Sequence, residues 1–226
     1  MPTIKTKSVK AAREPLRKER VLDTAVLLAD EQGLEALSMR RLGQALGVEA
    51  MSLYKHVRSK EDILDGIVDR VVSEIEAPDL RAEWQDAIRR RALSAHKVLM
   101  RHPWATMLLV SRKNMGPAML RYVDATIGCL TQAGFSYPLA DHAWNAIDSY
   151  VYGFTLQQLN FPFQPHEYAT AAKQFLPMLP PGLYPHLRGM SEQIISGAHD
   201  GLHELSFGLS LLLAGLEQLL PRQQVD

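Results

Sequence analysis

The sequence has a single cysteine, Cys129, among its 226 residues, so it can form no internal disulfide and no cysteine-based metal site. It also lacks any apolar run approaching the roughly 18 to 20 residues that a membrane-spanning helix requires. The first residues are basic but include no apolar stretch of the kind found in a signal peptide. These absences predict a cytoplasmic protein with no membrane partner, in which Cys129 is a small buried residue.

An excess of charge of one sign is also missing, because 25 basic residues balance 25 acidic residues and the formal net charge is zero. The distribution is nevertheless uneven, since Lys and Arg gather at the N-terminal end. A basic end on a neutral chain indicates a local contact with a polyanion, although a solvated tail would account for it equally well. We therefore predict a basic flexible tail over residues 1–13.

No stretch alternates apolar and polar residues with period two over a useful length, which argues against a β-sheet. Apolar residues recur instead at helical spacing, so the predicted fold class is all-α. The expected helices cover residues 14–32, 39–46, 51–56, 60–76, 82–101, 104–111, 116–133, 138–160, 166–176 and 198–220. The proline-rich segment 161–190 is expected to be mostly loop around the short helix within it.

The second and third predicted helices form a helix-turn-helix, separated only by the letters GVEA. Ser38 can cap the second helix and Gly47 can end it. The third helix is too short to be stable alone, but Leu53 and Val57, four residues apart, can pack it from behind. Its other face is then available for the major groove of DNA.

A family resemblance rests on three stretches of the sequence. LSMRRLGQALGVEAMSLYKHVRSKEDILDGI resembles the DNA-binding domain of TetR-family transcriptional regulators. EWQDAIRRRALSAHKVLMRHPW and SFGLSLLLAGLEQLL resemble the tetracycline-repressor-like C-terminal domain of that family. The resemblance implies a three-helix helix-turn-helix domain over residues 14–76, followed by a larger helical ligand-binding and dimerisation domain over residues 77–226.

The function that this resemblance implies is that of a ligand-responsive transcriptional regulator, in most cases a repressor. It would bind a pseudo-palindromic operator in double-stranded DNA as a homodimer. A small apolar or aromatic effector would release it. No cofactor, metal or catalytic residue is implied.

The resemblance also assigns residues to the DNA interface. Arg and Lys can read guanine edges or neutralise phosphates, Ser can donate to either, and a Tyr hydroxyl can reach a backbone oxygen. Met51 suits a thymine methyl group. The residues expected to face DNA are Arg40, Met51, Ser52, Lys55 and His56, with Tyr54 and Lys60 on the phosphates.

Methionine and aromatic residues at helical spacing in the second domain suit a pocket for a flat or apolar small molecule, because the flexible Met side chain can repack around ligands of different shapes. The same residues could equally form an ordinary core. The predicted pocket residues are Met100, Trp104, Met107, Leu108, Tyr122, Trp144, Ile147 and Phe154. By resemblance, Glu76, Arg91 and Met107 stand where the tetracycline repressor has His, Asn and His, so tetracycline is not the expected effector.

Leucines in the last predicted helix follow the 3-4 spacing of a packing seam, and Gly201, Gly208 and Gly215 recur every seven residues beside it. Glycine costs about 1 kcal/mol relative to Ala inside a helix, so a periodic set indicates close approach of another helix. That helix could belong to the same chain or to a symmetry mate. We predict a dimer interface at Leu202, Leu205, Gly208, Leu209, Leu212, Gly215 and Leu216.

Two other functions are compatible with parts of the sequence. His199 and His203 have i, i+4 spacing and could ligate zinc in a helical-bundle metalloenzyme. However, Asp200 stands where the zinc-protease pattern has Glu, and no third ligand is evident. The third possibility is a protein-interaction module with a vestigial helix-turn-helix.

Overall fold

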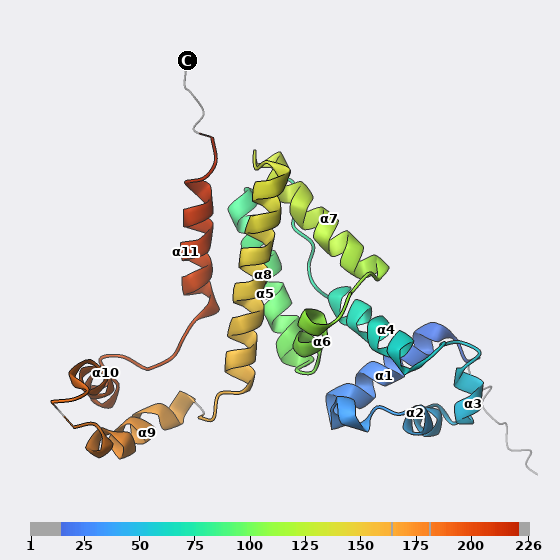
Figure 1. Ribbon diagram of the computed structural model, residues 1–226, viewed down its shortest axis with the longest axis horizontal. Coiled ribbons are helices and arrows are strands. Elements are labelled where there is room, and N and C mark those ends of the chain that lie inside the picture. The colour runs from blue at the N-terminus through green and yellow to red at the C-terminus, as the bar shows by residue number, and fades with distance from the viewer. Residues whose placement is uncertain (1–14, 164, 181, 222–226) are drawn as a thin grey trace, which may run out of the picture. The chain divides into compact units, whose positions relative to one another are not determined.

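The structure is a computed structural model that describes residues 15–163, 165–180 and 182–221. These residues form eleven α-helices and three short 3₁₀ helices, with no strand among them, as Figure 1 shows. The all-α prediction is therefore confirmed. No helix in the described ranges has the length and apolar content needed to cross a bilayer. The predicted basic tail, residues 1–13, lies outside the described residues.

The chain divides into two compact units, the first ending at Arg70 and the second beginning at Val71. The helices of the first unit are α1 (Lys18–Gln32), α2 (Met39–Leu46), α3 (Ala50–Leu53) and α4 (Lys60–Val72), whose last two residues belong to the second unit. Helix α2 packs on α1 and on α3. The core of this unit includes Leu42, Leu53 and Ile67, all completely buried.

Helix α8 is the central element of the second unit. It packs against α5, α7, α11 and α6, and Figure 1 shows α5 and α11 running alongside it. The helices of this unit are α5 (Trp84–Arg101), α6 (Ala105–Ser111), α7 (Pro117–Gln132), α8 (Tyr137–Leu159), α9 (Tyr168–Phe175), α10 (Pro185–Ser196) and α11 (Leu205–Glu217). Completely buried Ile88, Leu99 and Ile147 belong to its core.

A helix that was not predicted, α10 (Pro185–Ser196), begins inside the segment 161–190 and continues beyond it. Pro185 begins this helix instead of breaking it, because the first helical residue needs no backbone N–H. Gly197, with a left-handed φ of 78°, ends it. Helices α9 and α10 pack against each other.

The last helix begins later than predicted, at Leu205 instead of near residue 198. Gly201 has a φ of 76°, which is incompatible with a right-handed helix. Asp200 also accepts the backbone N–H of Leu202 at 2.9 Å, a local turn that competes with helix formation. The stretch 198–204 is therefore irregular, and Leu202 lies outside α11.

The first and third helices are also shorter than predicted. Arg17 is extended, with a φ of −134°, so α1 begins at Lys18. Helix α3 ends at Leu53, although Leu53 continues to accept the backbone N–H groups of His56 at 2.9 Å and Val57 at 3.0 Å. The predicted helix over residues 51–56 is thus a short α3 followed by hydrogen-bonded turns.

Candidate DNA-reading and effector sites

The turn between α2 and α3 is fixed by local chemistry. Ser38 Oγ caps α2 by accepting the Arg41 backbone N–H at 3.3 Å, and Gly47 ends the helix with a left-handed φ of 69°. Gly43 lies where the two elements meet, since a Cβ there would stand 2.8 Å from the Val48 carbonyl oxygen. The backbone after the turn therefore approaches α2 more closely than any side chain would permit.

Replacing Gly43 by alanine is expected to destabilise the first unit. The new methyl group meets backbone, which cannot swing aside, and overpacking of this kind typically costs about 1 to 3 kcal/mol. The higher helix propensity of alanine relative to glycine offsets up to about 1 kcal/mol of that loss. Gly128→Ala is the matched control, because a Cβ on that α7 residue meets nothing within 4 Å. Thermal unfolding followed by circular dichroism should show a lower midpoint for Gly43→Ala alone, and equal midpoints would contradict the close approach.

Helix α3 and the turns that follow it present one buried and one exposed side. Leu53 is completely buried and Val57 is 1% exposed, whereas Met51 is 74% exposed and Tyr54 is 47% exposed. The element is held by its apolar contacts and needs little stability of its own. Its outer side chains are consequently free to meet a partner.

The seven residues predicted to face DNA all keep part of their side chains exposed. Arg40 lies in the first turn of α2, Lys55 follows α3, and Lys60 begins α4. Ser52 and His56 are half-buried. The structure thus places the whole predicted set on α2, α3, the turns that follow α3 and the start of α4, all in one unit.

The start of α4 is anchored around Asp62. Its backbone N–H donates to Ser59 Oγ at 3.2 Å, so Ser59 caps the helix. Its carboxylate accepts the Arg58 backbone N–H at 3.0 Å and lies 2.9 Å from Lys18 Nζ. The Arg58 N–H, with a smaller contribution from Lys18, holds the pKa of Asp62 below its ordinary value. These contacts fix the helix end that carries Lys60.

A buried group of polar side chains lies in the second unit, and we call it the central polar cluster. Arg91 is completely buried and its Nη2 is 2.5 Å from Asp148 Oδ1. Tyr122 accepts a hydrogen bond from Arg91 Nη1 and donates to Asp148. The cluster joins α5, α7 and α8, and consists of Arg91, Tyr122, Thr126, Trp144, Asp148 and Tyr152.

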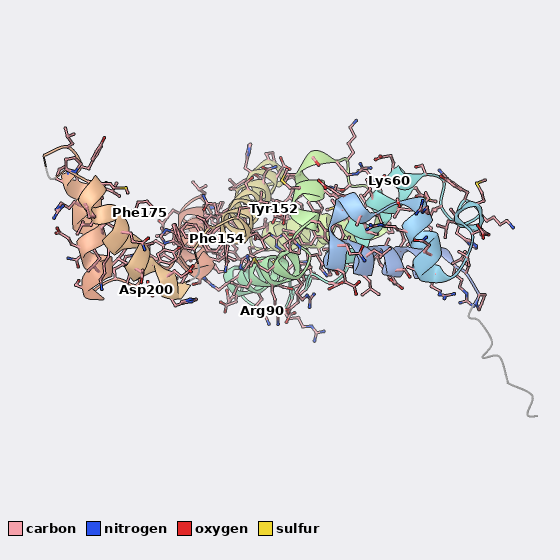
Figure 2. All side chains as sticks on the ribbon, turned by 90° about the horizontal axis from the view of Figure 1, so that it is seen from below. Lys60, Arg90, Tyr152, Phe154, Phe175 and Asp200 are labelled. Atoms are coloured by element: carbon pink, nitrogen blue, oxygen red, sulfur yellow. The ribbon has the colours of Figure 1, made fainter. Side chains whose placement is uncertain are left out.

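Asp148 is the acceptor at the centre of this cluster. Trp144 Nε1 donates to its Oδ2 at 2.7 Å and Tyr152 Oη donates at 3.1 Å. Trp144 and Tyr152 lie one turn to either side of Asp148 on α8 and are only half-buried; Figure 2 labels Tyr152. Among the described residues, Arg91 Nε has no hydrogen-bond partner. The cluster is thus a buried ion pair with additional donors on the side of Asp148.

Protonation within the cluster follows from its burial. Burial acts to lower the pKa of Arg91, but Tyr122 and Asp148 outweigh it and raise that pKa above its ordinary value. Burial also raises the pKa of both Tyr122 and Tyr152. Near neutral pH the guanidinium is therefore charged and both phenols remain hydrogen-bond donors.

The eight residues predicted to line an effector pocket do not meet in one place. Tyr122 and Trp144 belong to the central polar cluster. Ile147, which immediately precedes Asp148 in the sequence, is completely buried. Trp104 is buried with its ring centroid 6.1 Å from that of His102. Of the remaining four, Met107 is 54% exposed, Leu108 is half-buried, and Met100 and Phe154 line a separate cavity.

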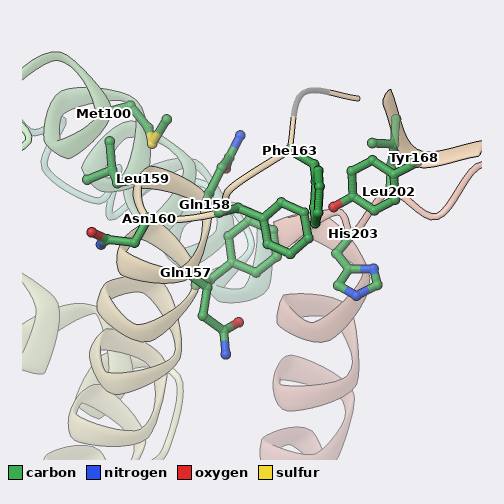
Figure 3. Close-up of a pocket in the computed structure, with 11 residues that line it drawn as sticks. Met100, Gln157, Gln158, Leu159, Asn160, Phe163, Tyr168, Leu202 and His203 are labelled. Atoms are coloured by element: carbon green, nitrogen blue, oxygen red, sulfur yellow. The ribbon is translucent and has the colours of Figure 1, made fainter. Parts of the chain in front are cut away.

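That separate cavity, which we call the α8-end cavity, has a volume of about 810 Å³. Figure 3 shows Met100 and Leu159 on one side of it and Tyr168 and His203 on the other. Its walls come from α5, α8, α9 and the segments that follow α8 and precede α11. They are formed by Met100, Phe154, Gln157, Gln158, Leu159, Asn160, Phe161, Phe163, Tyr168, Leu202 and His203.

A smaller cavity of about 420 Å³ lies between α7 and the stretch from Val72 to Ala77. Tyr122 of the central polar cluster forms part of its wall, together with Arg121 and Asp124. The α8-end cavity thus includes two residues of the predicted effector set, Met100 and Phe154, and the smaller cavity includes one, Tyr122.

Helix α11 is apolar on two sides. Leu205, Leu209, Leu213 and Leu216 are buried within the chain, whereas Phe207 is 70% exposed and Leu211 is 62% exposed. The predicted seam is therefore divided, because three of its leucines, 205, 209 and 216, already pack internally. Leu212 is half-buried, Leu202 lies outside the helix, and Gly215 is exposed with open space around it.

The glycine at position 208 has an intrachain explanation. A Cβ on Gly208 would stand 2.3 Å from Tyr150 Oη, so the tyrosine ring of α8 occupies that space. Tyr150 Oη also donates to the Leu205 carbonyl at 3.2 Å. This contact within the chain accounts for a glycine at position 208 without a second chain, and the dimer contact at Gly208 stays a prediction.

The histidines of the alternative metal site do not share a helix turn. His199 and His203 lie in the irregular stretch before α11, and His199 Nδ1 is 3.8 Å from Asp200. Within the described residues, no three His, Cys, Asp or Glu side chains are grouped to hold a metal ion. The metalloenzyme alternative loses the helical geometry on which it depended.

Two family models match the chain in succession. Residues 21–67 match the model described as "Bacterial regulatory proteins, tetR family". Residues 77–220 match the model described as "Tetracyclin repressor-like, C-terminal domain". The first match covers the helix-turn-helix, and the second covers α5 to α11, which include every helix that lines the α8-end cavity.

Curated relatives and solved structures agree with these matches. The chain is 32% identical to the HTH-type transcriptional repressor DrrR1 of Streptomyces coeruleorubidus over 216 residues, covering 91% of this chain and 79% of the relative. It is 29% identical to the class D tetracycline repressor protein of Escherichia coli, covering 89% of each. ActR of Streptomyces coelicolor in complex with actinorhodin superposes with a TM-score of 0.80 at 27% identity, covering 92% of this chain and 98% of that chain.

Proposed function

This chain belongs to the tetR family of bacterial regulatory proteins and is a ligand-responsive transcriptional repressor, and we propose that it binds a pseudo-palindromic DNA operator as a homodimer from which a small effector releases it. We further propose that it acts in the cytoplasm, where its operator DNA would lie. The observation that carries the proposal is the helix-turn-helix with its exposed outer side. Buried Leu53 and Val57 hold α3, while Met51, Tyr54 and Lys55 remain available.

DNA recognition is assigned to the N-terminal helices. We propose that Arg40, Ser52, Lys55 and His56 meet base edges or phosphates, and that Met51 meets a thymine methyl group. Tyr54 and Lys60 contact the phosphates of the DNA backbone. The anchoring of α4 around Asp62 supports the role of Lys60, because a phosphate contact needs a cation held in a fixed position.

Dimerisation is assigned to the second unit, where α8 and α11 leave neighbouring surfaces exposed. Phe207, Leu211 and Gly215 on α11 are exposed, as are the small residues Ala146, Ser149 and Gly153 on α8. Small residues permit close helix packing, and exposed apolar side chains are the usual core of a homodimer interface. A two-fold dimer also matches the symmetry of a palindromic operator.

The effector is proposed to be a small apolar or aromatic molecule bound by the second unit. The solved complex of ActR with actinorhodin supports this assignment, because this chain superposes on that protein over nearly its whole length. Tetracycline is not proposed, since Glu76, Arg91 and Met107 replace the residues expected to bind it. Arg91 is moreover already engaged by Asp148 and Tyr122.

Two lysine replacements test the DNA assignment. Lys60→Ala is expected to weaken binding to all sequences alike, and to reduce the slope of log affinity against log salt by about one unit, because one phosphate contact is lost. Lys55→Ala is expected mainly to relax sequence preference. Fluorescence anisotropy with an operator and a scrambled duplex, at several salt concentrations, measures both effects.

Lys97→Ala is the matched control for these changes, because Lys97 is an exposed cation on α5 of the second unit. It should leave affinity, salt dependence and sequence preference unaltered. An unchanged salt slope in Lys60→Ala would remove Lys60 from the phosphate contacts. An unchanged preference in Lys55→Ala would remove Lys55 from base recognition.

A further inference from the structure

We propose that the α8-end cavity is an effector-binding site, and that its ligand is an uncharged, flat, fused-ring aromatic molecule with carbonyl or hydroxyl groups along its edge. This inference rests on the proposed function, since it names the place and chemical class of the effector. It is independent of the central polar cluster, because the two share no residue.

The size and the ring content of the cavity support a flat aromatic ligand. Its volume of about 810 Å³ falls within the range of roughly 300 to 1,000 Å³ typical of small-molecule sites. Phe161 and Tyr168 stack with an interplanar angle of 9° and centroids 5.2 Å apart. Phe154 and Phe163 add two further rings to the wall. Aromatic walls of this kind favour a planar guest by offset stacking or edge contacts.

The polar groups of the cavity favour an uncharged ligand. None of the described residues that line it is Asp, Glu, Lys or Arg, and its one histidine, His203, is exposed to solvent, where water screens any charge that it carries. An ion taken out of water without a partner would be strongly disfavoured. The amides of Gln157, Gln158 and Asn160 can each donate and accept, so they match carbonyl and hydroxyl groups at a ring edge. Burial lowers the pKa of nearby His96, which contacts Phe154 edge-on and therefore adds no charge near neutral pH.

The part of the cavity wall that Tyr168 forms is held in place by a close contact with the backbone of Gly201. A Cβ on Gly201 would stand 2.6 Å from Tyr168 Cδ1, so the ring lies directly against the glycine backbone. Gly201 also has the left-handed φ of 76° that glycine adopts without strain. The Tyr168 ring is thus placed by the chain before any ligand arrives.

The position of the cavity suggests how a ligand there would act. Gln157 and Leu159 belong to α8, and Leu202 and His203 lead directly into α11. These are the two helices assigned to the homodimer interface. A ligand between them would change how the two α8–α11 pairs meet across the dimer, and so the spacing of the two DNA-reading elements.

Binding of 1,4-dihydroxyanthraquinone to the purified full-length protein tests the proposal directly. Fluorescence titration should show saturable binding to the wild type. Phe161→Ala should weaken it by about tenfold, the loss of one stacking contact, and Leu202→Trp should weaken it at least as much by filling the cavity. Tyr137→Ala is the matched control, because Tyr137 is an aromatic residue that is 74% exposed outside the cavity. It should bind like the wild type.

The charge selection is tested with anthraquinone-2-sulfonate, which keeps the ring system and adds an anion. We expect its affinity to be at least tenfold lower than that of the neutral probe. Equal affinity would overturn the requirement for an uncharged ligand. Failure of the neutral probe to bind, or equal binding by the wild type and by both cavity variants, would overturn the site.

These outcomes are separable from failure of the proposed function. Without ligand, the wild type and Phe161→Ala should retain operator DNA equally. If both retain DNA but the probe does not discriminate between them, the cavity assignment alone is wrong. If the wild type retains no specific DNA, the proposed function is wrong irrespective of probe binding.

Discussion

Arg91→Ala is expected to lower the free energy of unfolding by about 3 to 5 kcal/mol, the usual loss when one partner of a buried ion pair is removed. Asp148 would be left almost completely buried without its cation, at a side-chain exposure of 7%. Tyr122 would also lose the guanidinium that donates to its oxygen and lies over its ring, 4.9 Å from the centroid. Urea unfolding at one fixed protein concentration measures the change.

The control for this prediction is the adjacent residue in sequence. Arg90 is about half-exposed and lies 3.9 Å from Asp79, so Arg90→Ala should cost at most about 1 kcal/mol; Figure 2 labels Arg90. The double variant Arg91→Ala/Asp148→Ala should cost less than the sum of the two single changes, because it leaves no unpaired ion. Equal losses for Arg90→Ala and Arg91→Ala, or strict additivity in the double variant, would contradict the buried pair.

Leu211→Arg is expected to convert the dimer to monomer at micromolar concentration and to abolish specific operator binding. Leu211 is 62% exposed in the single chain, so the change should leave the fold intact. In a two-fold interface two arginines would be buried close together, and each would be desolvated beside a like charge. A monomer then engages only one half-site. Sedimentation velocity and anisotropy report the two consequences separately.

Leu120→Arg is the matched control for the dimer prediction. Leu120 is 51% exposed on α7, away from the proposed α8–α11 surface, so this variant should remain dimeric and bind operator. An intact dimer in Leu211→Arg would refute the interface. Gly208→Arg is unsuitable as a test, because the structure predicts that it displaces Tyr150 and damages the chain itself.

The helix-turn-helix could be predicted closely because its signals are local. The Ser38 cap, the Gly47 stop and the Leu53–Val57 pair each act within a few residues, and the structure contains all three. Gly43 was missed, although it is also in this motif. Its role depends on the path of the backbone after the turn, which no spacing of residues reveals.

The effector region was predicted less well because its features depend on tertiary contacts. Arg91 lies in a helix whose buried face includes Ala87, Ile88 and Ala95, and Asp148 lies in another between Ile147 and Val151. A basic residue on one apolar face and an acidic residue on another were the available signal for a buried pair. Which helices would meet, however, is decided by distant packing.

The wrong predictions for the C-terminal helices have a related cause. The proline-rich segment predicts loop, but Pro185 is the first residue of a helix, where proline is tolerated because that position needs no backbone N–H. The leucine repeat was read as one seam, but α11 has both a buried and an exposed apolar side. Repeat spacing indicates that a helix packs on other helices, and it does not say whether they belong to the same chain.

The central claim is that a dimer of this chain reads a specific operator through α3 and the turn that follows it. The most direct test is enrichment of fragments from sheared DNA of its own genome on the purified protein, with Lys55→Ala run in parallel. We predict that the wild type enriches a few fragments near promoters that share an inverted repeat, with half-site centres about 34 to 36 Å apart or a multiple of that distance. Lys55→Ala should lose this selectivity. Uniform recovery of all fragments by the wild type would contradict the claim.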